Sequence, residues 1–209
     1  MKYSEMTKTQ YLFYILLHPV TGFEELKFNR KGSVKIANFL CGLMCLAVVI
    51  QQTLCAFLFR EQRIEDINII WSVIGCIGML LLLSISNWLF CTLLEGKGKF
   101  TEIWIVCCYS MLPYIMISIP LTLVGHFFTM EESFFYSTMT VLLYAWSGLL
   151  LFVGLMAVHQ FTISKNIMTI FFTLVGIFIM LFLLLLIFTL LRNVYTFFVT
   201  IFNELSFRF

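Results

Sequence analysis

Long apolar stretches separated by short polar segments are the main pattern of this sequence. Five stretches contain at least 25 residues each and have no charged side chain in their interior. An α-helix rises about 1.5 Å per residue, so about 20 apolar residues cross the hydrocarbon core of a membrane. The pattern predicts five membrane-spanning helices, at residues 34–59, 67–94, 103–128, 133–158 and 167–191.

The composition agrees with an integral membrane protein. The chain has 209 residues, of which 61% are hydrophobic and 11% are charged, whereas a soluble domain has about 25% charged residues. We therefore predict an all-α integral membrane protein with one membrane domain, a five-helix bundle at residues 34–191. Residues 1–33 and 192–209 flank this domain. The expected location is the cell membrane, and the lipid bilayer is the first expected partner.

Basic residues indicate the orientation, because the cytoplasmic flanks of membrane helices collect Lys and Arg. A cytoplasmic N-terminus places nine bases inside and four outside. The nine are Lys2, Lys8, Lys27, Arg30, Lys31, Lys35, Lys97, Lys99 and Lys165. The four are Arg60, Arg63, Arg192 and Arg208. With five crossings, the C-terminus is then expected outside.

The N-terminal segment is expected to be a retained cytoplasmic or interfacial piece. Its apolar run, residues 11–17, is too short for the core of a signal peptide and is followed by His18 and Pro19. We predict an aromatic helix at the membrane surface over residues 7–17, ended by Pro19. Thr21 and Glu24 have the spacing of a capping box, which predicts a second helix starting there.

The C-terminal segment is expected to be amphipathic. Its apolar side chains recur at helical spacing, while Thr196, Thr200, Asn203 and Glu204 occupy the other side. Such a helix either lies in the interface plane or packs against the bundle, and neither arrangement adds a sixth crossing. The apolar residues are Val194, Phe197, Phe198, Ile201, Phe202 and Leu205.

The third span contains two prolines, Pro113 and Pro120, seven residues apart and nearly on one face. Each proline removes one backbone hydrogen bond, which frees the carbonyl groups of Tyr109 and Met116. Freed carbonyls in lipid need partners on neighbouring helices, or Ser and Thr side chains, or water. The span is therefore either a hinge or cavity wall, or a kink that only shapes packing.

A polar layer is expected between the second and third spans. Asn87 lies eight residues before Glu95, and Tyr109 lies seven residues after Glu102, so both should be about 10–12 Å inside the cytoplasmic boundary. We predict that Asn87 bonds to Tyr109, to Ser110 or to the freed Tyr109 carbonyl. The candidate layer and kink comprise Asn87, Tyr109, Ser110, Pro113, Tyr114 and Pro120.

Small residues on the first span predict a packing face. Ala37, Cys41 and Cys45 recur at four-residue intervals, which lets two helix backbones approach closely. All seven cysteines lie inside apolar stretches, and no Cys-x-x-Cys pair occurs. The cysteines therefore indicate neither a disulfide framework nor a zinc site, and no metal or cofactor is expected.

The arrangement resembles the Yip1 family of five-span membrane proteins. The resemblance rests on the helix pattern, on residues 96–100 (Gly-Lys-Gly-Lys-Phe) and on residues 109–114 (Tyr-Ser-Met-Leu-Pro-Tyr), which are similar to the family's Tyr-Ser-x-x-Pro-Tyr element. Residues 18–26 are similar to the entry segment of bacterial members. Eukaryotic members bind Rab GTPases, but their Asp-Leu-Tyr-Gly-Pro element is missing here. The resemblance implies an accessory or scaffolding membrane protein.

Three function classes can be compared. An enzyme has the least support, because Asp66 is the only aspartate and the three histidines, His18, His126 and His159, are expected at different places and cannot share a metal. A transporter coupled to ions is disfavoured, because the span interiors lack ionisable residues. A passive or lipid-handling path along the polar layer is the alternative. We expect a scaffold that binds lipids, another membrane protein or a second copy, and no nucleic acid.

Overall fold

The computed structural model describes residues 8–29, 32–56, 59 and 67–206. These residues form helices and no strand. The α-helices are α1 (Lys8–Leu17), α2 (Pro19–Phe28), α3 (Val34–Leu54), α4 (Ile69–Leu93), α5 (Phe100–Ser110), α6 (Leu112–Val124), α7 (Ser133–His159) and α8 (Ile163–Ser206). Two short 3₁₀ helices, η4 (Gly125–Phe127) and η5 (Met130–Glu132), connect α6 to α7.

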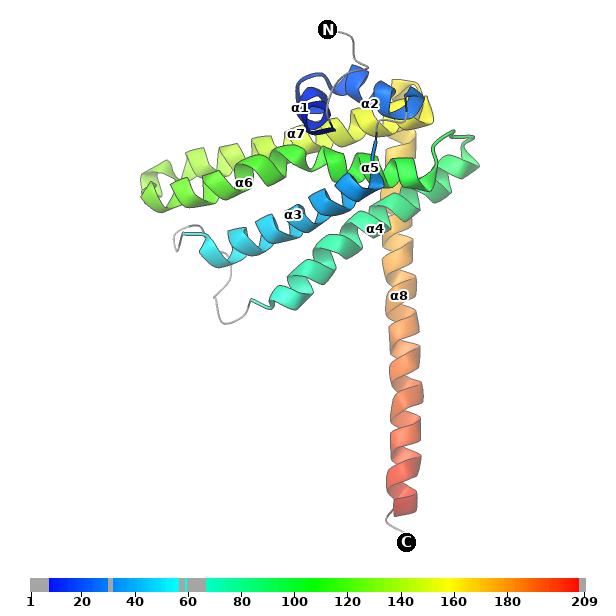
Figure 1. Cartoon of the computed structure of the whole chain (residues 1–209). Helices are drawn as coiled ribbons and strands as arrows, with labels where there is room; N and C mark the ends of the chain where they lie inside the picture. The colour runs from blue at the N-terminus through cyan, green and yellow to red at the C-terminus, as the bar shows by residue number, and fades with distance from the viewer. Residues whose placement is uncertain (1–7, 30–31, 57–58, 60–66, 207–209) are drawn as a thin grey trace.

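Five helical segments are long and apolar enough to cross a membrane. Four of them run side by side, namely α3, α4, the α5–α6 pair and α7, while α1 and α2 lie over α7 (Figure 1). The predicted fold class, an all-α membrane protein with five spans, is therefore confirmed. The cytoplasmic position of the N-terminus stays a prediction.

The third span is divided into two helices. Helix α5 ends at Ser110, Met111 forms a turn, and α6 begins at Leu112. Pro113 lies in the first turn of α6, where its missing N–H group costs no helical hydrogen bond. Pro120 lies inside α6, and the helix continues past it to Val124. The irregularity predicted for this span is thus a break centred on Met111.

The boundary between α1 and α2 differs from the prediction. His18 is the N-cap of α2, and Pro19 occupies its first turn. Proline is common in the first turn of a helix because its fixed φ angle already suits a helix. Thr21 therefore lies inside α2, and its hydroxyl donates to the His18 carbonyl at 3.4 Å. The predicted capping box of Thr21 and Glu24 is wrong, because Pro19 starts the helix two residues earlier.

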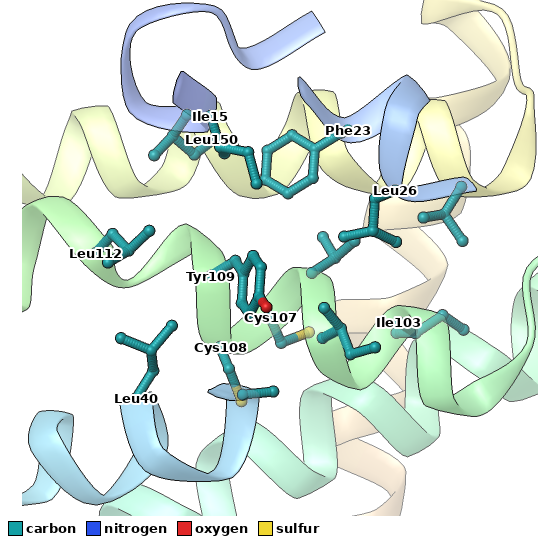
Figure 2. Packing of buried hydrophobic residues seen from close by; sticks show 14 of the residues in the cluster. Ile15, Phe23, Leu26, Leu40, Ile103, Cys107, Cys108, Tyr109, Leu112 and Leu150 are labelled. Carbon is teal, nitrogen blue, oxygen red and sulfur yellow. The ribbon is translucent and has the colours of Figure 1, made fainter. Parts of the chain in front are cut away.

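Helices α1 and α2 pack tightly on each other and on the bundle. The Tyr11 hydroxyl donates to the Gly22 carbonyl at 2.7 Å. Ile15 and Phe23 are completely buried, and Figure 2 shows them between α1, α2 and Leu150 of α7. Burying such side chains contributes about 1.5–3 kcal/mol each. The N-terminal helices are therefore part of the packed core, a closer association than a helix resting on the membrane surface.

Helix α5 is at the centre of the structure. In an 18-residue stretch of the α5–α6 span, 67% of the residues are buried, compared with 11% in such a stretch of α8. Tyr109 lies in the middle of the hydrophobic cluster, between Phe23 on one side and Leu40 on the other (Figure 2). Its hydroxyl accepts a hydrogen bond from the Ser33 backbone N–H at 3.3 Å, which joins α5 to the start of α3.

Helix α8 differs from the predicted C-terminal arrangement. The sequence suggested a span ending at 191 and a separate amphipathic segment, whereas α8 runs without a break from Ile163 to Ser206. Neither Gly nor Pro lies near Arg192, so the change in polarity does not interrupt the helix. Every residue from 181 to 205 is exposed, and α8 extends away from the bundle (Figure 1). The alternative in which this segment packs against the bundle is therefore wrong.

Several predicted features lie outside the described residues. They include Asp66 and six of the bases used to infer the orientation: Lys2, Arg30, Lys31, Arg60, Arg63 and Arg208. At the other end of the bundle, Thr129 and Glu132 form a capping box, in which the Glu132 carboxylate accepts from the Thr129 backbone N–H at 3.0 Å.

Candidate functional site

A buried polar cluster joins α4, α7 and α8 near the turn between α4 and α5. Its centre is Asn87 of α4, which is completely buried. The Asn87 side-chain Oδ1 lies 3.0 Å from His159 Nε2 on α7. The Asn87 Nδ2 donates to Thr173 Oγ1 on α8 at 3.2 Å. One amide therefore connects three helices that are far apart in the sequence.

The hydrogen-bond pattern indicates which ring nitrogen of His159 is the donor. The Thr173 hydroxyl donates to the Thr169 carbonyl at 2.8 Å, so its oxygen is free to accept from Asn87 Nδ2. The Asn87 Oδ1 then faces His159, and Nε2 must carry the proton that it donates. In the neutral imidazole Nδ1 is consequently the acceptor, and it has no hydrogen-bond partner among the described residues.

The turn between α4 and α5 covers the His159 ring. Glu95 has φ of 60°, which reverses the chain after α4. A Cβ atom on Gly96 would lie 2.7 Å from His159 Nδ1, and one on Gly98 would lie 2.6 Å from His159 Cε1. Contacts this short do not occur for real Cβ atoms, so both positions need glycine. The two glycines thus allow the backbone to seal the imidazole.

A charged layer lies over the same turn. Lys27 of α2 forms an ion pair with Glu102 of α5 at 2.7 Å, and it also donates to the Lys97 carbonyl at 2.8 Å. The Glu102 carboxylate accepts from the Lys99 backbone N–H at 3.1 Å. Lys97 donates to Gln160 Oε1, just past α7, at 3.1 Å. These contacts fasten α2, α5 and α7 to the turn.

Helix α8 enters the cluster with small and polar residues. The Ser86 hydroxyl donates to the Thr173 backbone carbonyl at 2.7 Å. A Cβ atom on Gly176 would collide with the Phe90 ring and the Ser86 hydroxyl, so α8 approaches α4 closely at this point. The Asn166 amide donates to the Phe152 carbonyl of α7 at 3.0 Å. Only the first third of α8 takes part in this packing.

The predicted partners of Asn87 are wrong. Tyr109 uses its hydroxyl for the Ser33 N–H group, and the Ser110 hydroxyl donates to the Val106 carbonyl of its own helix at 2.8 Å. The depth argument placed Asn87 and Tyr109 at one level but could not tell which face of its own helix each residue occupies. Asn87 bonds to His159 of α7 and Thr173 of α8 instead of to the pair on α5.

Tyr114, Pro113 and Pro120 lie on α6, apart from this cluster. The Tyr114 hydroxyl donates to Gln51 Oε1 of α3 at 2.5 Å, and its ring stacks on Tyr144 of α7 with centroids 5.6 Å apart. The six candidate residues of the polar layer and kink therefore divide into separate groups. Asn87 belongs to the cluster with His159, whereas Tyr114 links α6 to α3.

The three small residues of the proposed packing face are buried. Ala37 is completely buried, and Cys41 and Cys45 are 7% exposed. Helix α3 packs on α4, α5 and α6. All seven cysteines are free thiols, and six are buried while Cys76 is half-buried. Among the residues that the structure describes, no group of His, Cys, Asp and Glu is arranged to hold a metal ion.

His159, Thr173 and Asn166 were not among the candidate residues from the sequence. His159 was considered only as a possible metal ligand. A signal was nevertheless present in the fifth span, because Asn166, Thr169 and Thr173 recur at intervals of three and four residues. Polar residues at that spacing form one face of a helix, and buried polar residues in membranes need partners on a neighbouring helix.

The fold and the cluster define a multi-pass α-helical membrane protein whose spans are tied together at one end by buried polar contacts. The model of the Yip1 domain matches residues 13–187, from α1 into α8. The chain therefore belongs to the Yip1 domain family, as the sequence resemblance indicated. Comparison with curated proteins gave no match, and comparison with solved structures gave none either.

Proposed function

We propose that this protein is a non-enzymatic accessory subunit that binds another membrane protein through α8. The observation that supports this proposal is the exposure of every residue from 181 to 205. Only the first third of α8 packs on its own bundle, through residues such as Thr173 and Gly176. The remainder is an apolar helix available to a partner.

The length of α8 places its outer end beyond the hydrocarbon core, where a protein partner can cover it. Its 44 residues correspond to about 66 Å, while the hydrocarbon core is about 30 Å thick. Even a strongly tilted helix would leave residues near Phe198 and Phe202 beyond the hydrocarbon. Both side chains are exposed, by 64% and 73%. Large aromatic surfaces of this kind need cover from a partner or the membrane interface.

One apolar stripe continues along the outer part of α8. The stripe has alternating spacings of three and four residues, which is the pattern of helices that pack along each other. It passes Arg192 and Asn193 without losing register, because the helix is unbroken there. The residues are Leu184, Ile187, Leu191, Val194, Phe198, Ile201 and Leu205.

Photocrosslinking in native membranes tests this proposal. A photoreactive amino acid at Leu184 or Phe198 should give a discrete protein adduct, identified by mass spectrometry as a partner or a second copy. The same probe at Trp71, an exposed residue on α4, is the matched control and should label mainly lipid. Equal labelling from all three positions, or lipid adducts alone, would refute a partner on α8.

The alternative of a passive or lipid-handling path has less support. Asn87 was its central candidate, and its amide is completely buried and used by His159 and Thr173. Such a side chain joins helices and does not line a passage. Flux measurements in liposomes that contain only this chain test the alternative, because substrate or lipid transfer above that of empty liposomes would favour it over the scaffold.

A further inference from the structure

A groove of about 240 Å³ lies between α1 and α2, on a different part of the protein from the buried polar cluster. It is lined by Tyr14, Thr21, Glu24, Glu25, Phe28 and Asn29. The opposite face of α2, with Phe23 and Leu26, is buried against the bundle. The groove therefore opens outward, away from the other helices.

The lining combines carboxylates with aromatic rings. Glu25 accepts from the Asn29 side-chain amide at 3.0 Å, and Tyr14 shares a hydrogen bond of 2.9 Å with Thr21. These contacts hold the walls of the groove. Glu24 is exposed, and none of the interactions found among the described residues involves its carboxylate. The groove thus contains a negative charge that is available to a ligand.

The groove lies close to the aqueous rim of the bundle. Lys27, on the next turn of α2, contacts the Lys97 carbonyl in the connection between α4 and α5. Such a connection between two spans lies at the membrane surface, at the level of the lipid headgroups. Lys27 is paired with Glu102, so it does not neutralise the carboxylates of the groove.

We propose that this groove binds an ammonium group, and that its ligand is the headgroup of an aminophospholipid such as phosphatidylethanolamine. An ammonium group is attracted to the faces of aromatic rings, here Phe28 and the side of Tyr14 that is not stacked on His18, and to carboxylates, here Glu24 and Glu25. A ligand with a net negative charge would be repelled by the same two acids. The site is separate from α8, so either proposal can fail without the other.

Native mass spectrometry of the full chain in detergent tests the site. The probes are phosphatidylethanolamine and phosphatidylglycerol with the same acyl chains. Only the first has an ammonium group, and only the second has a net negative charge. Wild-type protein should retain phosphatidylethanolamine preferentially. Glu24→Gln and Phe28→Leu should each lower this preference about two- to fivefold, as expected for one exposed ion pair or one cation–π contact. Glu131→Gln, at an exposed carboxylate elsewhere, is the matched control and should leave it unchanged.

A second measurement separates a lipid headgroup from a free amine. Stabilisation by ethanolamine, measured by thermal unfolding in detergent, reports binding of the ammonium group without phosphate or acyl chains. Preferential retention of phosphatidylethanolamine together with binding of the free amine, both lost in Glu24→Gln, supports the lipid site. Binding of the free amine without a lipid preference keeps the ammonium site and refutes the lipid as its ligand. Equal retention of both lipids by wild type, with no binding of the free amine, overturns the proposal.

Discussion

The Nε2 atom of His159 donates its proton to the Oδ1 atom of Asn87 at 3.0 Å, which joins the end of α7 to α4. The same amide donates to Thr173 on α8. Because the lipid environment offers no competing water, the loss of one member leaves the other polar groups without partners. The stability of the bundle should therefore depend on this single amide.

Replacing Asn87 with Leu should destabilise the protein by about 1–2 kcal/mol, since the His159 N–H group then stays buried without an acceptor. Thermal unfolding in a mild detergent is the measurement. Asn193→Leu, on the exposed part of α8, is the control and should have little effect. An unchanged unfolding temperature in Asn87→Leu would contradict the role given to the cluster.

Gly98→Ala should destabilise the turn between α4 and α5. The added Cβ would lie 2.6 Å from His159 Cε1 and 2.8 Å from Val158 Cγ1, so the imidazole would have to move. Gly78→Ala is the matched control, because nothing lies within 4 Å of the Cβ that it would add. The control should be neutral or more stable by up to about 1 kcal/mol, since alanine favours helix. Equal unfolding temperatures for the two variants would exclude close packing of the turn on His159.

Phe23→Ala should release α2 from the bundle. Phe23 is completely buried, and removing a buried phenylalanine costs about 3–5 kcal/mol. Phe13→Ala, on the exposed side of α1 where Phe13 is 56% exposed, should cost less than about 0.5 kcal/mol. Hydrogen exchange of α1 and α2 measures the difference. Similar exchange in both variants would show that the N-terminal helices do not depend on this contact.

The packing of α1 on α2 should weaken at high pH. Burial raises the pKa of Tyr11 above its ordinary value of 10.0, chiefly because the phenolate would lose its hydration. The unfolded tyrosine loses its proton from about pH 10 upward, while the folded one keeps it, so stability falls as the pH rises through this range. Tyr11→Phe should remove this decline, although it also loses the hydrogen bond to Gly22. Hydrogen exchange of α1 and α2 is measured between pH 9 and 11, values chosen to bracket the ordinary tyrosine pKa. It compares how steeply stability falls with pH in the wild type and in Tyr11→Phe. Parallel slopes would mean that Tyr11 does not control the effect.

The orientation predicts that a tag at the N-terminus is protected in intact cells. The bases Lys27, Lys97 and Lys99 meet at one end of the bundle, and this end should face the cytoplasm. A tag at the C-terminus should be digested by external protease, since five crossings separate the two ends. Digestion of the N-terminal tag alone would show that the orientation is the opposite of the predicted one.

The sequence was sufficient to predict the spans but not the contacts between them. Apolar length determines where a helix can cross the membrane, so α4 (Ile69–Leu93) lies within the predicted range 67–94. Depth along a span is also readable, since it depends only on the rise per residue. The direction in which Asn87 faces could not be read, because α4 is apolar on all sides and its pattern has no distinct buried face.

The end of α8 was mispredicted for a related reason. A change from apolar to mixed residues after Leu191 indicates a change of surroundings, and it was interpreted as a change of element. Backbone hydrogen bonds within a helix do not depend on that change, and no proline or glycine interrupts them. A more accurate prediction needs the breaker residues and the polarity to be considered separately.

The free thiols have a practical consequence for the chemistry that can be applied to this protein. Six of the seven are buried, and Cys76 is half-buried within a span, so charged maleimides in the aqueous phase should hardly modify the folded wild-type chain. A single cysteine introduced at an exposed rim position would then give a signal above a nearly silent background. Spectroscopic labels could be attached site by site without first removing the native sulfur atoms.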